Sequence, residues 1–144
     1  MENKSHLTAI ARNAPSRPTM YLSACGKLRG RVLDYGCGRG KDADVFGFER
    51  FDPFYFPDMP VGTFDTVVCN YVLNVVPSPV ERVCILDAIK AALSPGGIAY
   101  ITVRNDRKKL NGWTQRKTWQ GLIELDLPVV TTNSNFTMYL LEDL

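Results

Sequence analysis

Histidine and paired cysteines are scarce in this sequence of 144 residues. It contains a single histidine, His6, and none of its four cysteines form a C-x-x-C pair. Because zinc sites are assembled from clustered Cys and His side chains, we predict no metal site. Ser–His–Asp catalysis is also disfavoured, since it would have to use a histidine beside the N-terminus. The cysteines are predicted to be small hydrophobic residues that stay reduced in a cytosol.

Long hydrophobic runs and a strong excess of one charge are missing as well. No stretch approaches the roughly 20 apolar residues of a membrane-spanning helix, and the N-terminus lacks the apolar core of a signal peptide. The net charge of +2 neither predicts nor excludes a nucleic-acid partner. With 45% hydrophobic residues, the chain can bury a core. We expect one cytoplasmic domain over residues 1–144, outside any membrane, and the sequence leaves its oligomeric state open.

Predicted strands and helices alternate along the chain. Buried strands are predicted from short apolar runs at residues 31–35, 48–51, 64–71 and 98–103. Helices are predicted at residues 5–13, 20–27 and 79–93, the last between Ser78 as N-cap and a stop at residues 94–97. This alternation indicates an α/β fold with a mostly parallel sheet. Residues 119–128 and 136–141, joined by residues 131–135, are predicted to add antiparallel strands.

A glycine-rich segment, D-x-G-x-G-x-G from Asp34 to Gly40, directly follows the first buried strand. Glycines there let the backbone turn sharply and approach a ligand at the carboxyl edge of the sheet. Asp34 can meet a cationic amino group, and backbone N–H groups past Gly36 can hold a carboxylate, so the turn suits the zwitterionic end of an amino acid. Asp52, twelve positions after Gly40, ends the next strand and is well placed to accept both ribose hydroxyls. The alternative for both acids is a turn residue and a cap.

These residues resemble the first motif of class I S-adenosylmethionine-dependent methyltransferases. Residues 64–77 are similar to the family's "FD-x-V … VL-x-x-V-P" segment, and residues 93–97 to its "L-x-P-G-G" turn. The resemblance covers roughly residues 30–104 and implies a Rossmann-like fold, with S-adenosylmethionine as cofactor and S-adenosylhomocysteine as product. More loosely, YGCGRGKD, FDPFYFPD and NYVLNVVP resemble methyltransferase-like proteins of bacterial and phage genomes, some associated with DNA phosphorothioation.

The resemblance also implies which residues bind the cofactor. The residues that would line the methionine end are Asp34, Gly36, Cys37, Gly38 and Gly40. Asp52 would hold the ribose, with Pro53 and Phe54 beside the adenosine. Asn70 and Tyr71 would lie near the sulfonium and the incoming acceptor, whereas Asn74, where many relatives have histidine, is expected to have no chemical part.

The sequence departs from the family's pattern in one respect. Only twelve positions separate Gly40 from Asp52, and twelve separate Asp52 from Phe64. The fold is therefore predicted to be abbreviated between the first and the fourth strand of the family's sheet. The adenine pocket is then either shortened or built from the loop at residues 54–59.

The predicted function is methyl transfer to an acceptor that is either a nucleic acid or a small molecule. From Arg104 to Lys117 the chain carries six basic residues, one acid and Trp113. This segment either tracks a phosphate backbone and stacks on a base, or is a solvated loop. Residues 1–28 either form a lid, with Arg17 and Tyr21 facing the cofactor, or add a helix over the sheet.

No catalytic residue is predicted, because alignment of the two reactants supplies much of the rate of such a displacement. If a proton has to be removed, the candidates are Tyr21, Tyr71 and Asp65, although Asp65 is better explained as a cap at the start of its strand. Two other functions remain open at this point. The chain could be an inactive accessory protein that binds S-adenosylmethionine, or an enzyme that consumes this cofactor without methylation.

Overall fold

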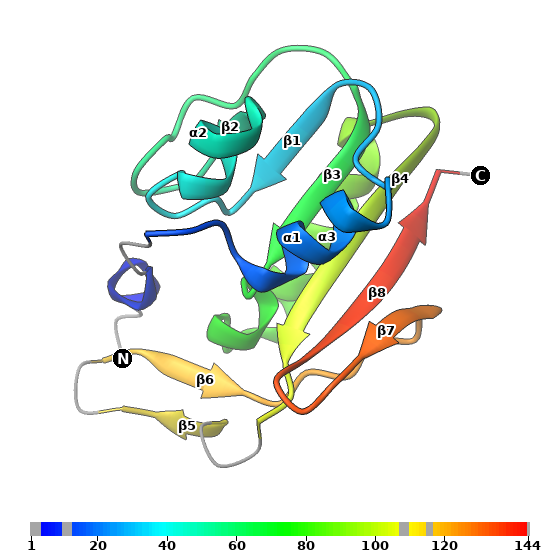
Figure 1. Cartoon of the computed structure of the whole chain (residues 1–144). Helices are drawn as coiled ribbons and strands as arrows, with labels where there is room; N and C mark the ends of the chain where they lie inside the picture. Colours follow the sequence, from blue (N-terminus) through cyan, green and yellow to red (C-terminus); the bar gives the residue numbers. More distant parts are fainter. Residues whose placement is uncertain (1–3, 10–12, 107–109, 115–116, 144) are drawn as a thin grey trace.

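A six-stranded sheet forms the centre of the molecule, whose computed structural model describes residues 4–9, 13–106, 110–114 and 117–143 (Figure 1). The strand order is β2-β1-β3-β4-β8-β7. Strands β2, β1, β3 and β4 run parallel, and β8 is antiparallel to both β4 and β7. The strands are β1 Val32–Tyr35, β2 Glu49–Phe51, β3 Phe64–Asn70, β4 Leu93–Arg104, β7 Val129–Thr132 and β8 Phe136–Glu142. The predicted α/β fold, mostly parallel with antiparallel C-terminal strands, is confirmed.

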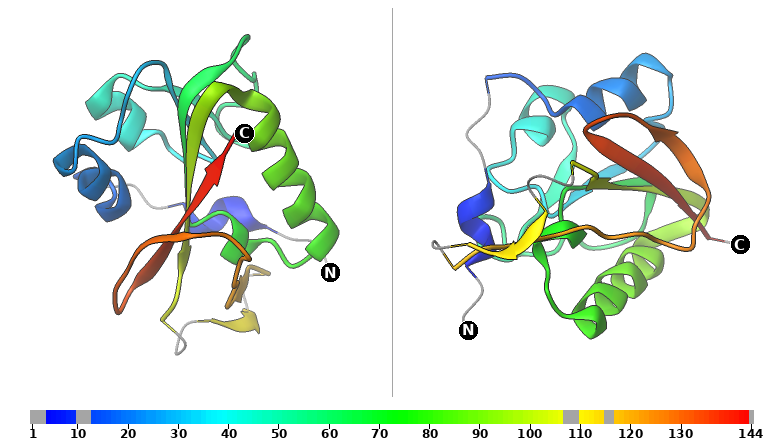
Figure 2. Two further views of the ribbon diagram at one scale, coloured as in Figure 1. Left: turned by 90° about the vertical axis from the view of Figure 1, so that its right-hand side faces the viewer. Right: turned by 90° about the horizontal axis from the view of Figure 1, so that it is seen from below.

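Helices cover both faces of this sheet. Figure 2 shows α3 on one face, and α1 and α2 on the other. The α-helices are α1 Arg17–Ala24, α2 Lys41–Phe46 and α3 Pro79–Ala92, and the 3-10 turns are η1 Ser5–Thr8 and η2 Leu73–Val75. No helix among the described residues has the length and apolar character to span a membrane.

The alternation of side chains along β3 places the core on both faces. Val67 and Cys69 pack with Ile89 of α3, whereas Val68, between them, packs with Leu22 of α1. All five side chains are fully buried. Because successive side chains of a strand point to opposite faces, a strand covered on both sides has to be apolar throughout. This explains why residues 64–71 form such a strong hydrophobic run.

The long helix begins as predicted and ends into a strand instead of a free turn. The Ser78 hydroxyl accepts a hydrogen bond from the backbone N–H of Glu81 at 3.2 Å, which is the expected N-cap. The helix ends at Ala92, and β4 starts at the next residue, where Leu93 pairs with Phe64. The predicted stop at residues 94–97 therefore lies inside β4, as an irregularity in its register with β3.

The C-terminal part corrects the predicted tail. Residues 119–128 do not form a strand of the main sheet: Trp119–Gly121 (β6) pairs with Asn111–Trp113 (β5) in a separate ribbon. The apolar side chains that follow, Ile123 among them, pack into the core without strand pairing. The strand next to β8 is the β-branched run Val129–Thr132, so Thr131 belongs to a strand and not to the connection.

The N-terminal helices also differ from their predicted bounds. The expected helix at residues 5–13 is a single 3-10 turn, Ser5–Thr8, and residues 10–12 lie outside the described part of the chain. The next helix starts at Arg17 and not at Met20. Pro18 falls in its first turn, where a missing backbone N–H costs no helical hydrogen bond.

The chain is short between β1 and β3, as predicted. It supplies only the six-residue α2, the three-residue β2 and a loop. Arg31, which precedes β1, holds this loop: its guanidinium pairs with Glu49 and donates to the backbone oxygens of Val61 and Thr63 at 2.7 and 3.2 Å. A single arginine thus ties the abbreviated region to the start of the sheet.

Gly36→Ala is predicted to destabilise the fold more than Gly26→Ala. Both glycines have a positive φ, 78° and 65°, which costs an alanine about 1–2 kcal/mol. A Cβ at position 36 would also lie 2.3 Å from Cγ2 of Val72, whereas one at position 26 meets nothing within 4 Å. We expect an additional loss of about 1–3 kcal/mol for Gly36→Ala, measured by urea unfolding. Equal losses for the two variants would contradict the close packing of Gly36 on Val72.

Candidate functional site

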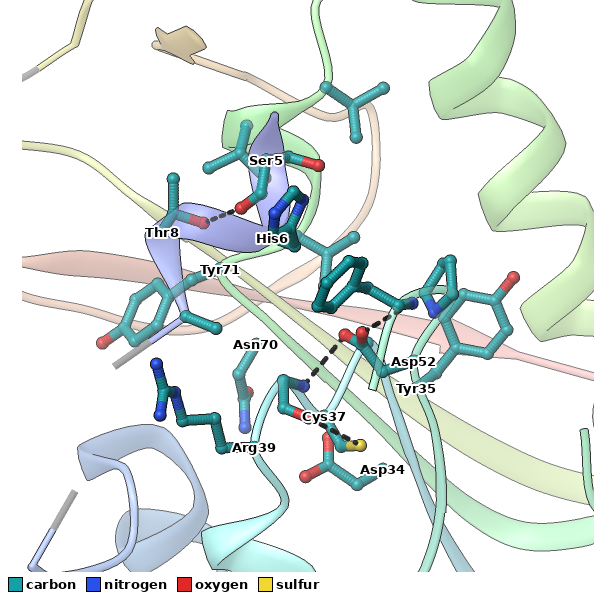
Figure 3. Close-up of a pocket in the computed structure, with 18 of the residues that line it drawn as sticks. Ser5, His6, Thr8, Asp34, Tyr35, Cys37, Arg39, Asp52, Asn70 and Tyr71 are labelled. Carbon is teal, nitrogen blue, oxygen red and sulfur yellow. Dashed lines mark hydrogen bonds between the residues drawn. The ribbon is translucent and has the colours of Figure 1, made fainter. Parts of the chain in front are cut away.

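A cavity of about 300 Å³ opens at the carboxyl ends of β1 and β3. Its walls come from segments that are far apart in the sequence: residues after β1, β2, β3 and β4, and the N-terminal residues 5–9. Figure 3 shows labelled side chains from the N-terminal segment and from the ends of β1, β2 and β3 around the cavity. All nine predicted cofactor-binding residues line it: Asp34, Gly36, Cys37, Gly38, Gly40, Asp52, Pro53, Asn70 and Tyr71. The structure brings them together, and their role in binding stays a prediction.

Asp34, near the end of β1, is the most unusual polar group of the cavity. It is 3% exposed, and its carboxylate accepts no hydrogen bond from the residues that the structure describes. Burial, and after it the negative charges of Asp42 and Asp52, raise the pKa of this carboxyl well above its usual value. A buried carboxylate without donors is unfavourable, so the site favours a ligand that brings a positive charge to Asp34.

The carboxylate of Asp52, after β2, accepts most of its hydrogen bonds from backbone N–H groups of the protein itself. Oδ1 accepts from the N–H of Gly38 at 3.0 Å, and Oδ2 accepts from the N–H groups of Phe54 and Tyr55 at 3.0 and 2.9 Å. Since a carboxylate offers about four acceptor positions, roughly one is left for a ligand. Asp52 therefore has one open acceptor position for a ribose hydroxyl, and its predicted contact with both hydroxyls stays a prediction.

The backbone of the glycine loop, residues 36–40, is likewise engaged. Gly36 and Cys37 donate their N–H groups to the oxygen of Phe51 at 2.7 and 3.0 Å, and Gly40 donates to Cys37 at 3.0 Å. With Gly38 bound to Asp52, four of the five amides of the loop are engaged within the protein, and the N–H of Arg39 forms no hydrogen bond with the described residues. The expectation that N–H groups past Gly36 hold a carboxylate stays a prediction, and among residues 36–40 it now depends on the N–H of Arg39. Two cationic side chains, Arg39 and Lys41, line the same part of the cavity and can also hold a carboxylate.

The Cys37 thiol faces the cavity in its neutral form. Burial, together with the charges of Asp34 and Asp52, raises the pKa of this thiol to about 12. Because the thiolate is the reactive species, Cys37 is a packing residue and not a nucleophile at neutral pH.

A buried network that the sequence analysis missed fixes the floor of the cavity. The Asp42 carboxylate accepts from the backbone N–H of Ser16 at 2.7 Å and from the hydroxyls of Ser16 and Thr19 at 2.6 and 2.7 Å. Asn70 donates its side-chain N–H to the Thr19 hydroxyl at 2.9 Å. The network joins the starts of α1 and α2 to the tip of β3. Only Ser16, as an N-cap before Pro18, left a signal in the sequence.

The N-terminal segment closes one side of the cavity. The His6 ring stacks on Phe54, with 3.9 Å between ring centroids and 9° between planes, and the Tyr55 hydroxyl donates to the His6 oxygen at 3.4 Å. The predicted lid residues lie elsewhere. Neither Arg17 nor Tyr21 lines the cavity, and Tyr21, a residue of α1, packs against the core cluster that contains Leu22.

Tyr71 and its neighbours form the opposite wall. Tyr71 has a φ of 61°, rare for a residue with a side chain. Asn74, for which no part was expected, is 1% exposed and donates to the Gln120 side chain at 3.0 Å. Arg104 lines this wall at the end of β4. Of the predicted basic segment, residues 107–109 and 115–116 lie outside the described residues.

Asp65 lies away from this cavity, at the other end of β3. Its carboxylate accepts from the backbone N–H of Arg31 at 2.8 Å and from the Ser94 hydroxyl at 3.0 Å. Asp65 therefore caps the start of β3, which is the explanation that the sequence favoured over a role as a base. Within the described residues, no group of three or more His, Cys, Asp or Glu could hold a metal ion.

Several solved structures share the fold of this chain. The chain is similar to the N-methyltransferase NodS from Bradyrhizobium japonicum WM9, in complex with S-adenosylhomocysteine (TM-score 0.59, 12% identity, 96% of each chain covered). It is also similar to DhpI in a complex with SAH (0.59, 14%, 85% of this chain and 81% of that chain). A hypothetical protein of Thermus thermophilus is similar as well, with a TM-score of 0.56 and 18% identity over 93% of this chain and 90% of that chain. At such identities the likeness shows a shared fold. Two further structures that the chain matches are covered over 50% and 52% of their own length.

The sequence comparisons identify the family. No curated protein sequence matches the chain. Residues 7–125, however, match the model of the family described as "Methyltransferase domain", and this range contains all the residues that line the cavity except His6 and Ser5. The family resemblance predicted from the glycine-rich segment is thereby confirmed: the chain belongs to the methyltransferase domain family.

Proposed function

We propose that the protein transfers a methyl group from S-adenosylmethionine to a nucleophile at this cavity. The observation that carries the proposal is the buried carboxylate of Asp34, which faces the cavity without a hydrogen-bond donor among the described residues. The cofactor supplies a methyl carbon that the nucleophile's electron pair attacks, while the carbon–sulfur pair passes to the sulfur and gives S-adenosylhomocysteine. The ammonium group of the cofactor supplies the positive charge that the Asp34 carboxylate lacks as a partner.

The described residues fit the rest of the cofactor in a definite order. Asp34 meets the ammonium group, and Arg39 or Lys41 meets the carboxylate. Asp52 accepts one ribose hydroxyl through its remaining acceptor position. Phe54, held against His6, offers an aromatic face on the adenosine side. This assignment agrees with the predicted roles except at the carboxylate and the second ribose hydroxyl.

The protein's main contribution to the reaction is alignment. The Asp42 network and the Asp52 turn fix the walls of the cavity before any ligand binds. An amine or thiolate acceptor then needs no catalytic base, because holding the nucleophile in line with the methyl group supplies much of the rate. Of the three residues considered as bases, Tyr71 alone lines the cavity, whereas Tyr21 and Asp65 do not. Tyr71 is therefore the residue to test if the acceptor has to lose a proton.

Two acceptor classes and two rival functions belong to this proposal. A nucleic acid would be held by the basic residues from Arg104 to Lys117, and a small molecule by the cavity alone. An accessory protein that binds cofactor without turnover is the main rival, because Asp52 and the glycine loop have few polar groups left for a ligand. An assay for S-adenosylhomocysteine with and without acceptors distinguishes transfer from both binding alone and acceptor-independent consumption of the cofactor.

Asp34→Asn is predicted to weaken cofactor binding, because the amide keeps the shape of the side chain and removes its negative charge. We expect the wild-type protein to bind S-adenosylhomocysteine with a micromolar dissociation constant, and the variant to bind at least about tenfold more weakly. Isothermal titration calorimetry measures both. Asp44→Asn is the matched control, since Asp44 is exposed and pairs with Arg50 outside the cavity. Absence of binding to the wild-type protein would remove the proposed function, and equal binding by Asp34→Asn would remove the role of Asp34.

Cofactor affinity is also predicted to fall as the pH is lowered. Burial raises the pKa of Asp34 in the free protein, whereas a bound ammonium group favours its ionised form. Binding therefore releases a proton below the raised pKa, and the dissociation constant increases as the pH falls through it. Calorimetry between pH 5 and 8 in buffers of different ionisation enthalpy measures this release. Asp34→Asn should release no proton from this position on binding. If the dissociation constant of the variant has the same pH dependence as that of the wild-type protein, another group is responsible.

A further inference from the structure

Arg104, at the end of β4, is a partly buried cation without a counter-charge among the described residues. Its Nε is buried and has no hydrogen-bond partner, and its guanidinium forms no ion pair with any residue that the structure describes. The side chain lines the cavity. An arginine offers five N–H donors in a fixed planar arrangement, and a cation removed from water is costly when it stays unpaired. Arg104 thus has donors to give to a ligand.

The surrounding residues hold Arg104 in place. Its guanidinium carbon lies 6.0 Å from the centre of the Tyr71 ring, at a distance where a cation still interacts with an aromatic face. Its backbone N–H donates to Asn74 Oδ1 at 3.4 Å, and Asn74 is in turn bound to Gln120 of β6. Glu81 lines the same cavity and forms no ion pair with Arg104. The wall around Arg104 is therefore built from η2, β4 and β6.

Asp34 and Asp52 lie on the opposite side of β3 from Arg104. The two acids lie at the ends of β1 and β2, whereas Arg104 ends β4. Asn70 and Tyr71, at the tip of β3, lie between them in the strand order. If the cofactor's cationic end takes the side of Asp34, the side of Arg104 is left to the second reactant.

We propose that Arg104 binds an anionic oxygen group, a carboxylate or a phosphate, of a small-molecule methyl acceptor. The inference rests on the proposed methyl transfer and specifies the substrate class of the same cavity. A planar guanidinium can bind either group through two parallel hydrogen bonds. The nucleophile of the acceptor then lies towards Tyr71. Arg104 is a specificity-determining residue, since an acceptor without the anion leaves the buried Nε–H without a hydrogen-bond partner and the positive charge without a counter-charge.

The partial burial of Arg104 favours a small acceptor over a nucleic acid. Proteins that track nucleic-acid phosphates present their cations along an open groove, whereas the Nε of Arg104 is shielded from solvent beside a cavity of about 300 Å³. A terminal carboxylate or phosphate monoester can enter such a space with its oxygens first. A phosphate within a polynucleotide carries chain on both sides and would have to remain at the mouth.

Anion titration of the protein saturated with S-adenosylhomocysteine tests the proposal. Acetate, phosphate and the neutral analogue acetamide are added at constant ionic strength, and the arginine Nε–H resonances are followed by NMR. We expect acetate or phosphate to shift, saturably and at millimolar concentration, a resonance that is missing from Arg104→Gln, and acetamide to shift none. The anion that binds more tightly shows which group the acceptor carries.

Variants decide whether Arg104 is responsible. Arg104→Gln should weaken anion binding at least about tenfold, and Arg104→Lys should weaken it less, because charge is kept while the planar donor set is lost. Arg29→Gln is the matched control: Arg29 is exposed, precedes β1 at the opposite end of the sheet and should leave binding unchanged. Affinity for S-adenosylhomocysteine, measured on each variant, verifies that the cavity is intact.

Several outcomes overturn the proposal. Anion binding that is absent from the wild-type protein, or equally strong in Arg104→Gln, would show that Arg104 does not recognise an anion. Binding of a single-stranded oligonucleotide through Arg104, with no binding of acetate or phosphate, would assign the residue to nucleic acid. If S-adenosylhomocysteine fails to bind at all, the proposed function fails. The same titration without it then still decides the role of Arg104.

Discussion

The different environments of three neighbouring carboxylates determine what the site can do. Asp42 accepts three hydrogen bonds from the start of α1, and Asp52 accepts three from backbone N–H groups. Both are compensated within the protein and serve to hold its segments together. Asp34, near the end of β1, accepts no such hydrogen bonds and is buried next to both charges. Its ionised form is stabilised when a cationic ligand enters, so binding relieves a cost that folding leaves in place.

The Asp52 carboxylate also explains how the short segment between β1 and β3 can still form a wall of the cavity. Between β1 and β3 there is room for one helix of six residues and one strand of three. Asp52 closes this region by binding the glycine loop to the turn after β2, and residues 5–9 add the missing side through the His6–Phe54 stack. As a consequence, four of the five backbone amides of residues 36–40 form hydrogen bonds within the protein, and the proposed contacts with the ligand are made mainly by charged side chains.

Local patterns predicted the fold, and the resemblance to a methyltransferase family implied the nine residues that line the cavity. Neither predicted the contacts between distant segments. The D-x-G-x-G-x-G segment follows a buried strand, so its place at the carboxyl edge follows from chain geometry. The pairing of Asp42 with Ser16, 26 positions apart, leaves no periodic signal. The apolar residues after Trp119 were mistaken for a strand because burial in the core and pairing in a sheet select the same residue types. Arg104 was grouped with a basic surface segment, because net charge does not reveal which residue of a segment faces a cavity.

Direct titration of the Asp34 carboxyl tests the central claim. Carbon-13 NMR of the aspartate side chains, with Asp34→Asn for assignment, measures its pKa in the free protein and with S-adenosylhomocysteine bound. The account predicts a pKa raised above that of an ordinary aspartate in the free protein, and a clear decrease when the ligand binds, because the ammonium group then faces the carboxylate. An ordinary pKa in the free protein, or a raised pKa that the bound ligand leaves unchanged, would contradict the assignment of Asp34 as the cation-binding group.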